Sequence, residues 1–431
     1  MKKVLIISPN FPPVNSADMH RVRHIVNFLT EFGWYAEVVT VTPAMVESYS
    51  TDDLLLKSLP NNLKVHFVQA WDVKWTRKFG LGSLSMRSFL YYRRKVNSIL
   101  TENVFDLVFF STTAFHVMAL GPYWKRKFDI PFVIDIQDPW RSDFYLDKPT
   151  HERPPKFWIS YNLDKYLEKI TIPRADGIIS VSETYLEIFK KRYGKISSNN
   201  KVIPFAGFEK DFEIIGDLAL PSQVQFSTEE INIVYVGRGG YDMHMAVEIY
   251  FSSLNLLKER NPDIFSRVKT FFLGTSYAPK GKGKATLAMV GINMENGHKV
   301  LEISDRFEYF STLKILQSAD ILFIPGSVDV GYTASKVFPY ILAKRPLIAC
   351  VSESSSVVDI LKACTNAEIC TFKHDTKDTD FVVNALYRSL VTTIGNIGNI
   401  IDYDAKEFER YSARFMTKDV VSLFDYCLTK A

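Results

Sequence analysis

Short apolar segments alternate with helical stretches along almost the whole chain. Several segments, such as Leu107–Phe110, are apolar at successive positions, which is typical of strands covered on both faces. Alternation of this kind predicts parallel sheets built from βαβ units. We expect strands over Val4–Ser8, Ala36–Val41, Leu63–Val68, Asp106–Ser111, Pro131–Ile136, Gly177–Ser182, Lys201–Pro204, Ile231–Gly237, Val268–Gly274, Asp320–Pro325, Pro346–Val351 and Ala367–Thr371.

The same strand–loop–helix opening occurs in both halves of the chain. Val4–Ser8 leads through a proline-rich loop into a helix over Met19–Phe32, and Ile231–Gly237 leads through a glycine-rich loop into Met243–Leu257. The pattern predicts an α/β fold with two Rossmann-like doubly wound domains facing a central cleft. We expect the domains to span 1–207 and 231–402, with a linker over 208–230 and a final helical segment over 403–431.

Composition excludes several classes of protein. A net charge of +4 on 431 residues is too small to imply nucleic-acid binding. The four cysteines form no C-x-x-C pair, so we expect buried thiols in a reducing compartment rather than disulfides or a zinc site. Because no apolar run approaches the roughly 20 residues needed to cross a bilayer, we expect a cytoplasmic protein, soluble or peripheral at the inner face of the membrane.

In the first half, three loops follow predicted strands. The first, 9–20, contains Asn15 and Ser16, ends on the possible helix cap Asp18 and leads to Arg21. Its residues could contact an acceptor or a phosphate, or form a rigid surface loop. In the second, Asp138 could bind sugar hydroxyls and Trp140 could stack on sugar C–H groups, although Asp138 also suits a helix cap before proline. In the third, His116 could bind a substrate hydroxyl or be structural.

Two loops of the second half suit a phosphate. Gly237, Gly239 and Gly240 let backbone approach a ligand closely, and Arg238 between them can bind phosphate oxygens. The later loop holds Thr333, Ser335 and Lys336 before a predicted helix, whose N-terminus favours an anion. The alternative is a serine cap with a solvated lysine. Gly274 and Tyr309 lie near strand ends and could frame a nucleotide base.

Residues 71–100 mix seven lysines and arginines with aromatic side chains and a single acid, Asp72. This mixture suits an anionic membrane surface or a lipid-linked acceptor, or an ordinary helical hairpin with solvated basic faces. Asp378 and Asp380 match the D-x-D of metal-dependent transferases, but their charged surroundings favour a solvated cap. Neither a G-x-G-x-x-G after the first strand nor a Walker P-loop is present.

Taken in order, several motifs resemble the GT-B-fold, nucleotide-sugar-dependent glycosyltransferases, in particular the retaining group-1 (family 4-like) bacterial type. The resemblance rests on the segments Phe11-Pro12-Pro13, Asp138-Pro139-Trp140, Ala175–Ser182, Tyr235–Arg238, Ser318–Ile321 and Ser335–Tyr340. It implies a hexosyltransferase-type enzyme of bacterial surface-polysaccharide or glycoconjugate synthesis, which uses no cofactor and needs no metal. The final helix would return to the first domain.

The same resemblance implies roles for individual residues. Arg238 and Lys336 would neutralise the diphosphate of a nucleotide-sugar donor, and His116 and Asp138 would lie nearest the transferred sugar. The acceptor, a glycan or a lipid-linked molecule, would lie against the first domain. The family often has two glutamates where this chain has Gly331 and Pro339, the second binding the ribose. The alternatives are therefore a non-catalytic GT-B-like protein that binds a sugar nucleotide or a partner, or a sugar-nucleotide epimerase.

Overall fold

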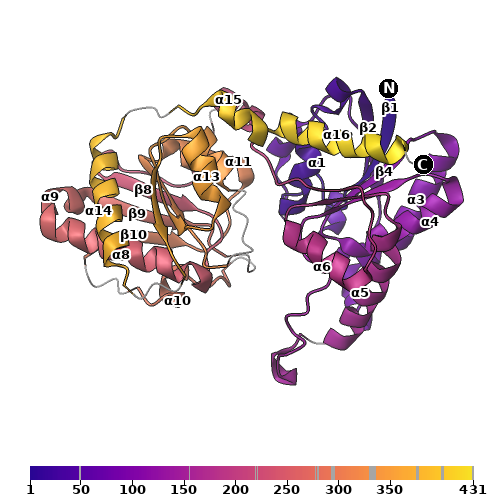
Figure 1. Ribbon diagram of the computed structural model, residues 1–431, viewed down its shortest axis with the longest axis horizontal. Coiled ribbons are helices and arrows are strands. Elements are labelled where there is room, and N and C mark those ends of the chain that lie inside the picture. Colours follow the sequence, from indigo (N-terminus) through magenta and orange to yellow (C-terminus); the bar gives the residue numbers. More distant parts are fainter. Residues whose placement is uncertain are drawn as a thin grey trace. The chain divides into compact units, whose positions relative to one another are not determined.

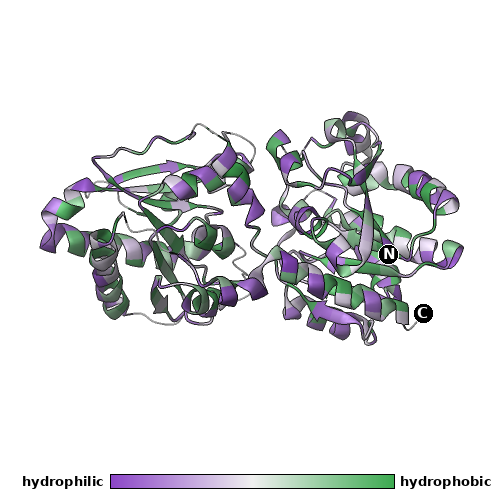
Figure 2. Cartoon of the chain, turned by 90° about the horizontal axis from the view of Figure 1, so that it is seen from above, coloured by the Kyte–Doolittle hydropathy of each residue, from purple (hydrophilic) through white to green (hydrophobic). Residues whose placement is uncertain are grey.

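The computed structural model describes residues 1–47, 50–154, 156–218, 220, 222–276, 278, 281–292, 297–329, 336–374, 378–398 and 402–429. The chain divides into two compact units, one formed by Met1–Ala206 with Ala413–Ala431 and the other by Gly207–Ser412 (Figure 1). Each unit is a parallel sheet flanked by helices, which confirms the predicted α/β class. Strand residues in both sheets are mostly hydrophobic, and hydrophilic residues gather on the helices (Figure 2).

The first unit contains a seven-stranded sheet in the order β3-β2-β1-β4-β5-β6-β7. β1 pairs with both β2 and β4, so that Val4 lies opposite Ala36 and Leu107. The chain reverses its direction of travel across the sheet at β1 and β4, which is where doubly wound folds bind ligands. The strands are β1 Lys2–Ile7, β2 Trp34–Val41, β3 Lys64–Val68, β4 Leu107–Ser111, β5 Phe132–Ile136, β6 Gly177–Ser180 and β7 Asn200–Val202.

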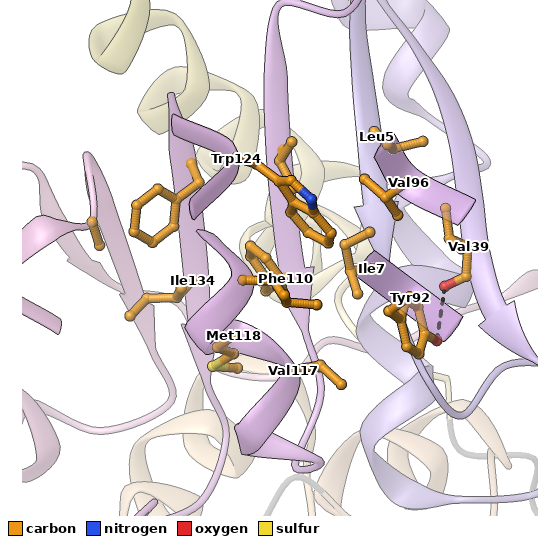
Figure 3. Close-up of a cluster of buried hydrophobic side chains, with 14 of the residues drawn as sticks. Leu5, Ile7, Val39, Tyr92, Val96, Phe110, Val117, Met118, Trp124 and Ile134 are labelled. Carbon is orange, nitrogen blue, oxygen red and sulfur yellow. Dashed lines mark hydrogen bonds between the residues drawn. The ribbon is translucent and has the colours of Figure 1, made fainter. Parts of the chain in front are cut away.

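One face of this sheet is covered by aromatic packing from α3 (Leu84–Glu102) and α4 (Gly121–Phe128). Phe110 of β4 stacks on Trp124 with ring centroids 5.7 Å apart (Figure 3). Tyr92 is fully buried, and its hydroxyl donates to the Val39 carbonyl at 3.3 Å. These large rings hold α3 and α4 firmly on the sheet.

The last helix, α16 (Ala413–Thr429), covers the other face of the same sheet. Phe424 packs edge-on against Trp34 and Phe109, with ring centroids 5.3 and 5.1 Å apart. The helix is also tied to the unit by an ion pair between Lys201 and Asp419. Helix α16 is therefore part of the hydrophobic core of the first unit.

The second unit contains a six-stranded sheet in the order β10-β9-β8-β11-β12-β13. Its switch point lies between β8 and β11. Residues 208–230, expected to be a linker, include the helix α7 (Lys210–Asp217), which belongs to this unit. The strands are β8 Ile231–Val236, β9 Val268–Leu273, β10 Lys299–Ile303, β11 Ile321–Pro325, β12 Leu347–Ser352 and β13 Glu368–Phe372.

Two local features differ from the prediction. β10 was not expected, because this edge strand mixes Lys299 and Glu302 with apolar residues and is only partly buried. The single helix expected over Met19–Phe32 is broken into α1 (His20–Ile25) and a 3₁₀ turn at Leu29–Phe32. Between them the Asn27 side chain donates to the Arg23 carbonyl at 2.9 Å, competing with the regular helical bond.

Candidate active site

A pocket in the second unit opens at the carboxyl ends of β8, β11 and β12, at the switch point of the sheet. The beginnings of α12 (Val337–Leu342) and α13 (Ser356–Cys364) complete its wall. The pocket combines apolar side chains with hydroxyl groups and one lysine. It is lined by Tyr235, Ile324, Pro325, Gly326, Ser327, Asp329, Lys336, Val337, Tyr340, Val351, Ser352, Ser354, Ser355 and Val357.

Lys336 directly precedes α12, and its side chain lines this pocket. Its Nζ is buried and has no hydrogen-bond partner among the described residues. A Cβ atom at Gly237 would lie 2.7 Å from this nitrogen, so glycine at the end of β8 makes room for the ammonium group. Burial lowers the pKa of Lys336 to about 7; the charges of Arg238 and Arg306 lower it further, and Asp242 opposes them. A buried cation of this kind is well suited to bind an anion.

Arg238 lies beside Lys336 and is held by Asp242. Its two terminal nitrogens donate to the two carboxylate oxygens at 3.1 and 2.6 Å, and Ser327 donates to the same carboxylate at 2.6 Å. Burial raises the pKa of Asp242, but the hydrogen bonds from Arg238 and Ser327 outweigh it and lower the pKa overall. The guanidinium is thus oriented and still partly exposed, with 29% of its side chain accessible.

The glycines around Arg238 are required by close contacts. A Cβ at Gly239 would lie 1.8 Å from the Thr286 hydroxyl, and one at Gly240 would lie 2.6 Å from an Asp242 oxygen. Neither position could hold a larger residue without moving its neighbours. The loop after β8 therefore packs closely against side chains of its own unit, and its contact with a ligand stays a prediction.

The two candidates for a nucleotide base have different surroundings. Gly274 follows β9 with φ at +68°, and a Cβ there would lie 3.9 Å from the Arg306 Cα atom. Tyr309 begins α11 (Tyr309–Ser318), and its hydroxyl donates to Asp211 of α7 at 2.7 Å. Tyr309 thus links two helices of its own unit. Contact of either residue with a base stays a prediction.

The helix that follows the phosphate loop is α12, which begins at Val337. Thr333, Ser335 and Gly331 lie outside the described residues. Pro339 occupies the first turn of α12, where its missing N–H removes no helical hydrogen bond. The next residue, Tyr340, places its hydroxyl 2.7 Å from the Val236 nitrogen and 3.1 Å from the Val236 oxygen. Proline is therefore compatible with a helix that supports the end of β8.

In the first unit, a buried carboxylate organises the corresponding switch point. Asp18 is 3% exposed and accepts hydrogen bonds from Asn10, Ser16, Thr112 and Thr113. These donors come from the loop after β1 and the loop after β4, so the carboxylate ties the two loops together. Ser16 is itself buried, and its hydroxyl is used inside this network. Asn15 donates its backbone N–H to the Ser50 carbonyl at 2.9 Å.

Arg21 has a structural role instead of the expected contact with an acceptor. Its side chain and that of Asp135 are both fully buried, and they form an ion pair at 2.7 Å. Arg21 also donates to the Ile203 carbonyl at 2.6 Å and lies over the Phe205 ring at 5.0 Å. The expectation failed because the partner of Arg21 is on β5, far away in the sequence.

Asp138 and Trp140 follow β5 but differ in exposure. Asp138 reaches solvent, yet the surrounding protein and then the Asp18 charge raise its pKa. Trp140 is only 5% exposed and stacks on Phe115 with ring centroids 5.7 Å apart. The ring of Trp140 is thus a core element, which leaves little of it for stacking on a sugar. Asp138 stays available to a ligand.

His116 lies between α3 and α5 (Phe157–Thr171). Its Nδ1 is 2.6 Å from the Ser85 hydroxyl, and its Nε2 is 3.0 Å from an Asp164 oxygen, outside good hydrogen-bond geometry. The ring is 16% exposed. Its surroundings resemble those of a structural histidine, and a role next to the transferred sugar stays a prediction.

Sequence reasoning missed the residues that connect these loops. Gln137 donates to Asp135, to Ser111 and to the Asp18 carbonyl, at 2.8, 3.0 and 3.2 Å. The sequence indicates for Asp18 only a possible helix cap. The usable signal was polar residues at the ends of three neighbouring strands, where buried side chains must bond to one another. In the described residues, no group of three or more histidines, cysteines or acids is placed to hold a metal.

Solved structures of known proteins share the fold of this chain over their full lengths. HepE from Anabaena, in complex with UDP-glucose, matches with a TM-score of 0.56 and 12% identity over 99% of this chain and 100% of that chain. The α,α-trehalose 6-phosphate synthase from Burkholderia multivorans matches with a TM-score of 0.59 and 11% identity over 100% of both chains. At this identity, the likeness shows the fold. A search of curated proteins finds no match.

The two doubly wound units of this chain therefore have the GT-B fold of these structures. Residues 20–205 match the model for Glycosyltransferase Family 4. This match covers most of the first unit and confirms the predicted family resemblance.

Proposed function

We propose that this glycosyltransferase takes a sugar from a UDP-sugar and transfers it to a glycan or lipid-linked acceptor. The observation that carries the proposal is the buried ammonium of Lys336, which has no partner among the described residues. It lies next to Arg238 and within electrostatic reach of Arg306. Two cationic groups at this switch point, with a third within electrostatic reach, suit the diphosphate of a nucleotide sugar.

UDP is the first choice of nucleotide because HepE, which shares the fold, is in complex with UDP-glucose. The leaving UDP carries negative charge, which Lys336 and Arg238 would stabilise without a metal ion. Ser352, Ser354 and Ser355 would offer hydroxyl groups to the polar parts of the donor. Pro339 offers no side-chain hydrogen bond, so in this proposal the ribose relies on such groups.

The acceptor side belongs to the first unit in this proposal. Asp138 is the exposed acid at the end of β5, and the Asp18–Gln137 network fixes the loop on which it stands. Transfer with retention at the anomeric carbon, and a place in bacterial surface-polysaccharide or glycoconjugate synthesis, follow from the family resemblance. A peripheral contact with an anionic membrane through residues 71–100 would bring the enzyme to a lipid-linked acceptor.

The test is a panel of UDP, GDP, ADP, CMP and their sugar conjugates, followed by thermal unfolding with and without EDTA. We expect UDP and one UDP-sugar to raise the midpoint of unfolding, equally in both conditions, because binding to the native state stabilises it. A shift that EDTA abolishes would contradict the metal-independent site. If no nucleotide shifts the midpoint, the donor site is wrong.

Affinity for UDP should also depend on pH through Lys336. The phosphate charge favours the protonated lysine, so binding raises a pKa that is about 7 in the unliganded protein. From about pH 7 to about pH 9 the Kd should therefore rise, by at most about tenfold per pH unit, with uptake of a proton on binding. Calorimetry in buffers of different ionisation enthalpy measures that uptake. In Lys336→Met the dependence should vanish; a pH-independent Kd in the unmodified protein would contradict this assignment.

A further inference from the structure

Helix α5 of the first unit exposes three large apolar side chains, two of them aromatic. Trp158, Ile159 and Tyr166 are 51%, 71% and 61% exposed. At about 100° per residue, these three positions and Lys165 and Lys169 share an arc of about 120° on the helix. In Figure 1, α5 stands at the lower end of the first unit, beyond its sheet.

Charges on α5 are sorted between its two sides. The acids turn inward: Asp164 lies 3.0 Å from the His116 ring, and Glu168 is fully buried and bonded to Arg192 at 3.0 Å. Lys165 and Lys169 are exposed on the same arc as the aromatic rings. The outward face of the helix is therefore aromatic and purely cationic.

A second segment continues this face. Lys156, just before α5, donates to the Lys78 carbonyl at 3.4 Å, which places the 71–80 segment beside the helix. In that segment Trp75 is 67% exposed and Lys78 lies 4.9 Å from its ring centroid. The only acid there, Asp72, caps the short helix α2 (Val73–Thr76) by accepting from the Lys74 N–H at 2.7 Å.

The rest of the basic and aromatic region lies mainly on α3, where some of its side chains are buried. In α3, Tyr92 is fully buried, and Arg87 is 2% exposed and bonded to Glu47 and to the Trp71 carbonyl. Arg93, Arg94 and Lys95 of α3 are exposed, but the exposed aromatic rings described in residues 71–100, Trp71 and Trp75, both lie in 71–80.

We propose that the outward face of α5, with residues 71–80, binds the surface of an anionic lipid bilayer. Tryptophan and tyrosine rings settle at the boundary between headgroups and acyl chains, and lysines beside them attract anionic headgroups. No helix in the described ranges is long and apolar enough to span a membrane, so the contact is peripheral. The inference deepens the membrane contact of the proposed function and uses no donor-site residue.

Sedimentation with vesicles tests the proposal, using phosphatidylcholine alone or mixed equally with phosphatidylglycerol. The unmodified protein should bind the mixed vesicles and release them at high salt, because salt screens the lysines. Trp158→Ala/Ile159→Ala should weaken binding roughly tenfold through lost apolar contact. Lys165→Glu/Lys169→Glu should weaken it by at least about fivefold per lysine.

Matched controls lie in the second unit, where Phe381 is 80% exposed and Lys362 is also exposed. Phe381→Ala and Lys362→Glu should bind vesicles normally. All variants should keep the UDP affinity and circular dichroism of the unmodified protein, which separates this proposal from the donor site. Absence of vesicle binding by the unmodified protein would overturn it. So would variants that still bind vesicles but lose a concentration-dependent dimer, since the face would then bind a second copy.

Discussion

Replacing Lys336 with methionine is expected to weaken UDP binding roughly 10- to 100-fold, because hydrogen bonds to charged groups contribute about 1.5–3 kcal/mol. The same change should make the unliganded second unit more stable. In the folded protein the ammonium is buried without a partner among the described residues, and burial is the main cause of its lowered pKa. Methionine keeps the apolar stem and removes the charge, so the free energy of unfolding should rise by at least about 1 kcal/mol at neutral pH.

Arg238→Met is the informative control for this prediction. Arg238 is paired with Asp242, so its loss should reduce both UDP affinity and stability. Titration calorimetry gives the affinities, and scanning calorimetry gives the stabilities. All six tryptophans precede residue 159, in the first unit, so tryptophan emission should be unchanged in both variants. A Lys336→Met protein that binds UDP normally would remove the central argument for the donor site.

The effect of Lys336 on the free energy of unfolding of the second unit should vary with pH in a definite direction. Its pKa in the folded protein is about 7, well below the value of about 10.4 expected in an unfolded chain. Between these two values the unfolded state binds more protons, so the second unit gains stability as pH rises. The stabilising effect of Lys336→Met should therefore shrink toward about pH 10.

Strand prediction worked where burial dominates and failed at an edge. β4 and β8 are buried at every position, and apolar runs of that kind are readable without a structure. β10 is half exposed at the side of its sheet, where its partner β9 decides the conformation. The end of the helix at Ile25 could not be predicted either, since it depends on the hydrogen bond that the Asn27 side chain donates to the Arg23 carbonyl.

Site prediction was limited by the direction of side chains. Lys336 and Gly237 were placed in separate loops by sequence, and only the structure shows that the lysine needs the space left by the glycine. Arg21 and Trp140 were expected to contact a ligand because they lie in loops that follow strands. That position does not show which side chains are buried. Asp18 was undervalued for the converse reason: five donor groups on four residues of two loops surround a residue that sequence reads as a cap.

Arg21→Met is expected to lower the free energy of unfolding of the first unit by about 3–5 kcal/mol, the usual result of breaking a buried ion pair. It leaves the fully buried Asp135 carboxylate with only the neutral donors Ser111 and Gln137, and it removes the bond to the Ile203 carbonyl. Urea unfolding followed by tryptophan emission measures the first unit alone, since the second unit has no tryptophan.

The exposed pair Arg414–Glu31 is the matched control in the same unit, because its side chains are 48% and 43% accessible. Arg414→Met should cost less than about 1 kcal/mol. Adding Asp135→Leu to Arg21→Met should recover part of the loss, because the double variant no longer buries a lone charge. A loss in Arg21→Met no larger than in Arg414→Met would mean that the ion pair does not hold the loops of the first unit, and that the Asp18–Gln137 network alone positions Asp138.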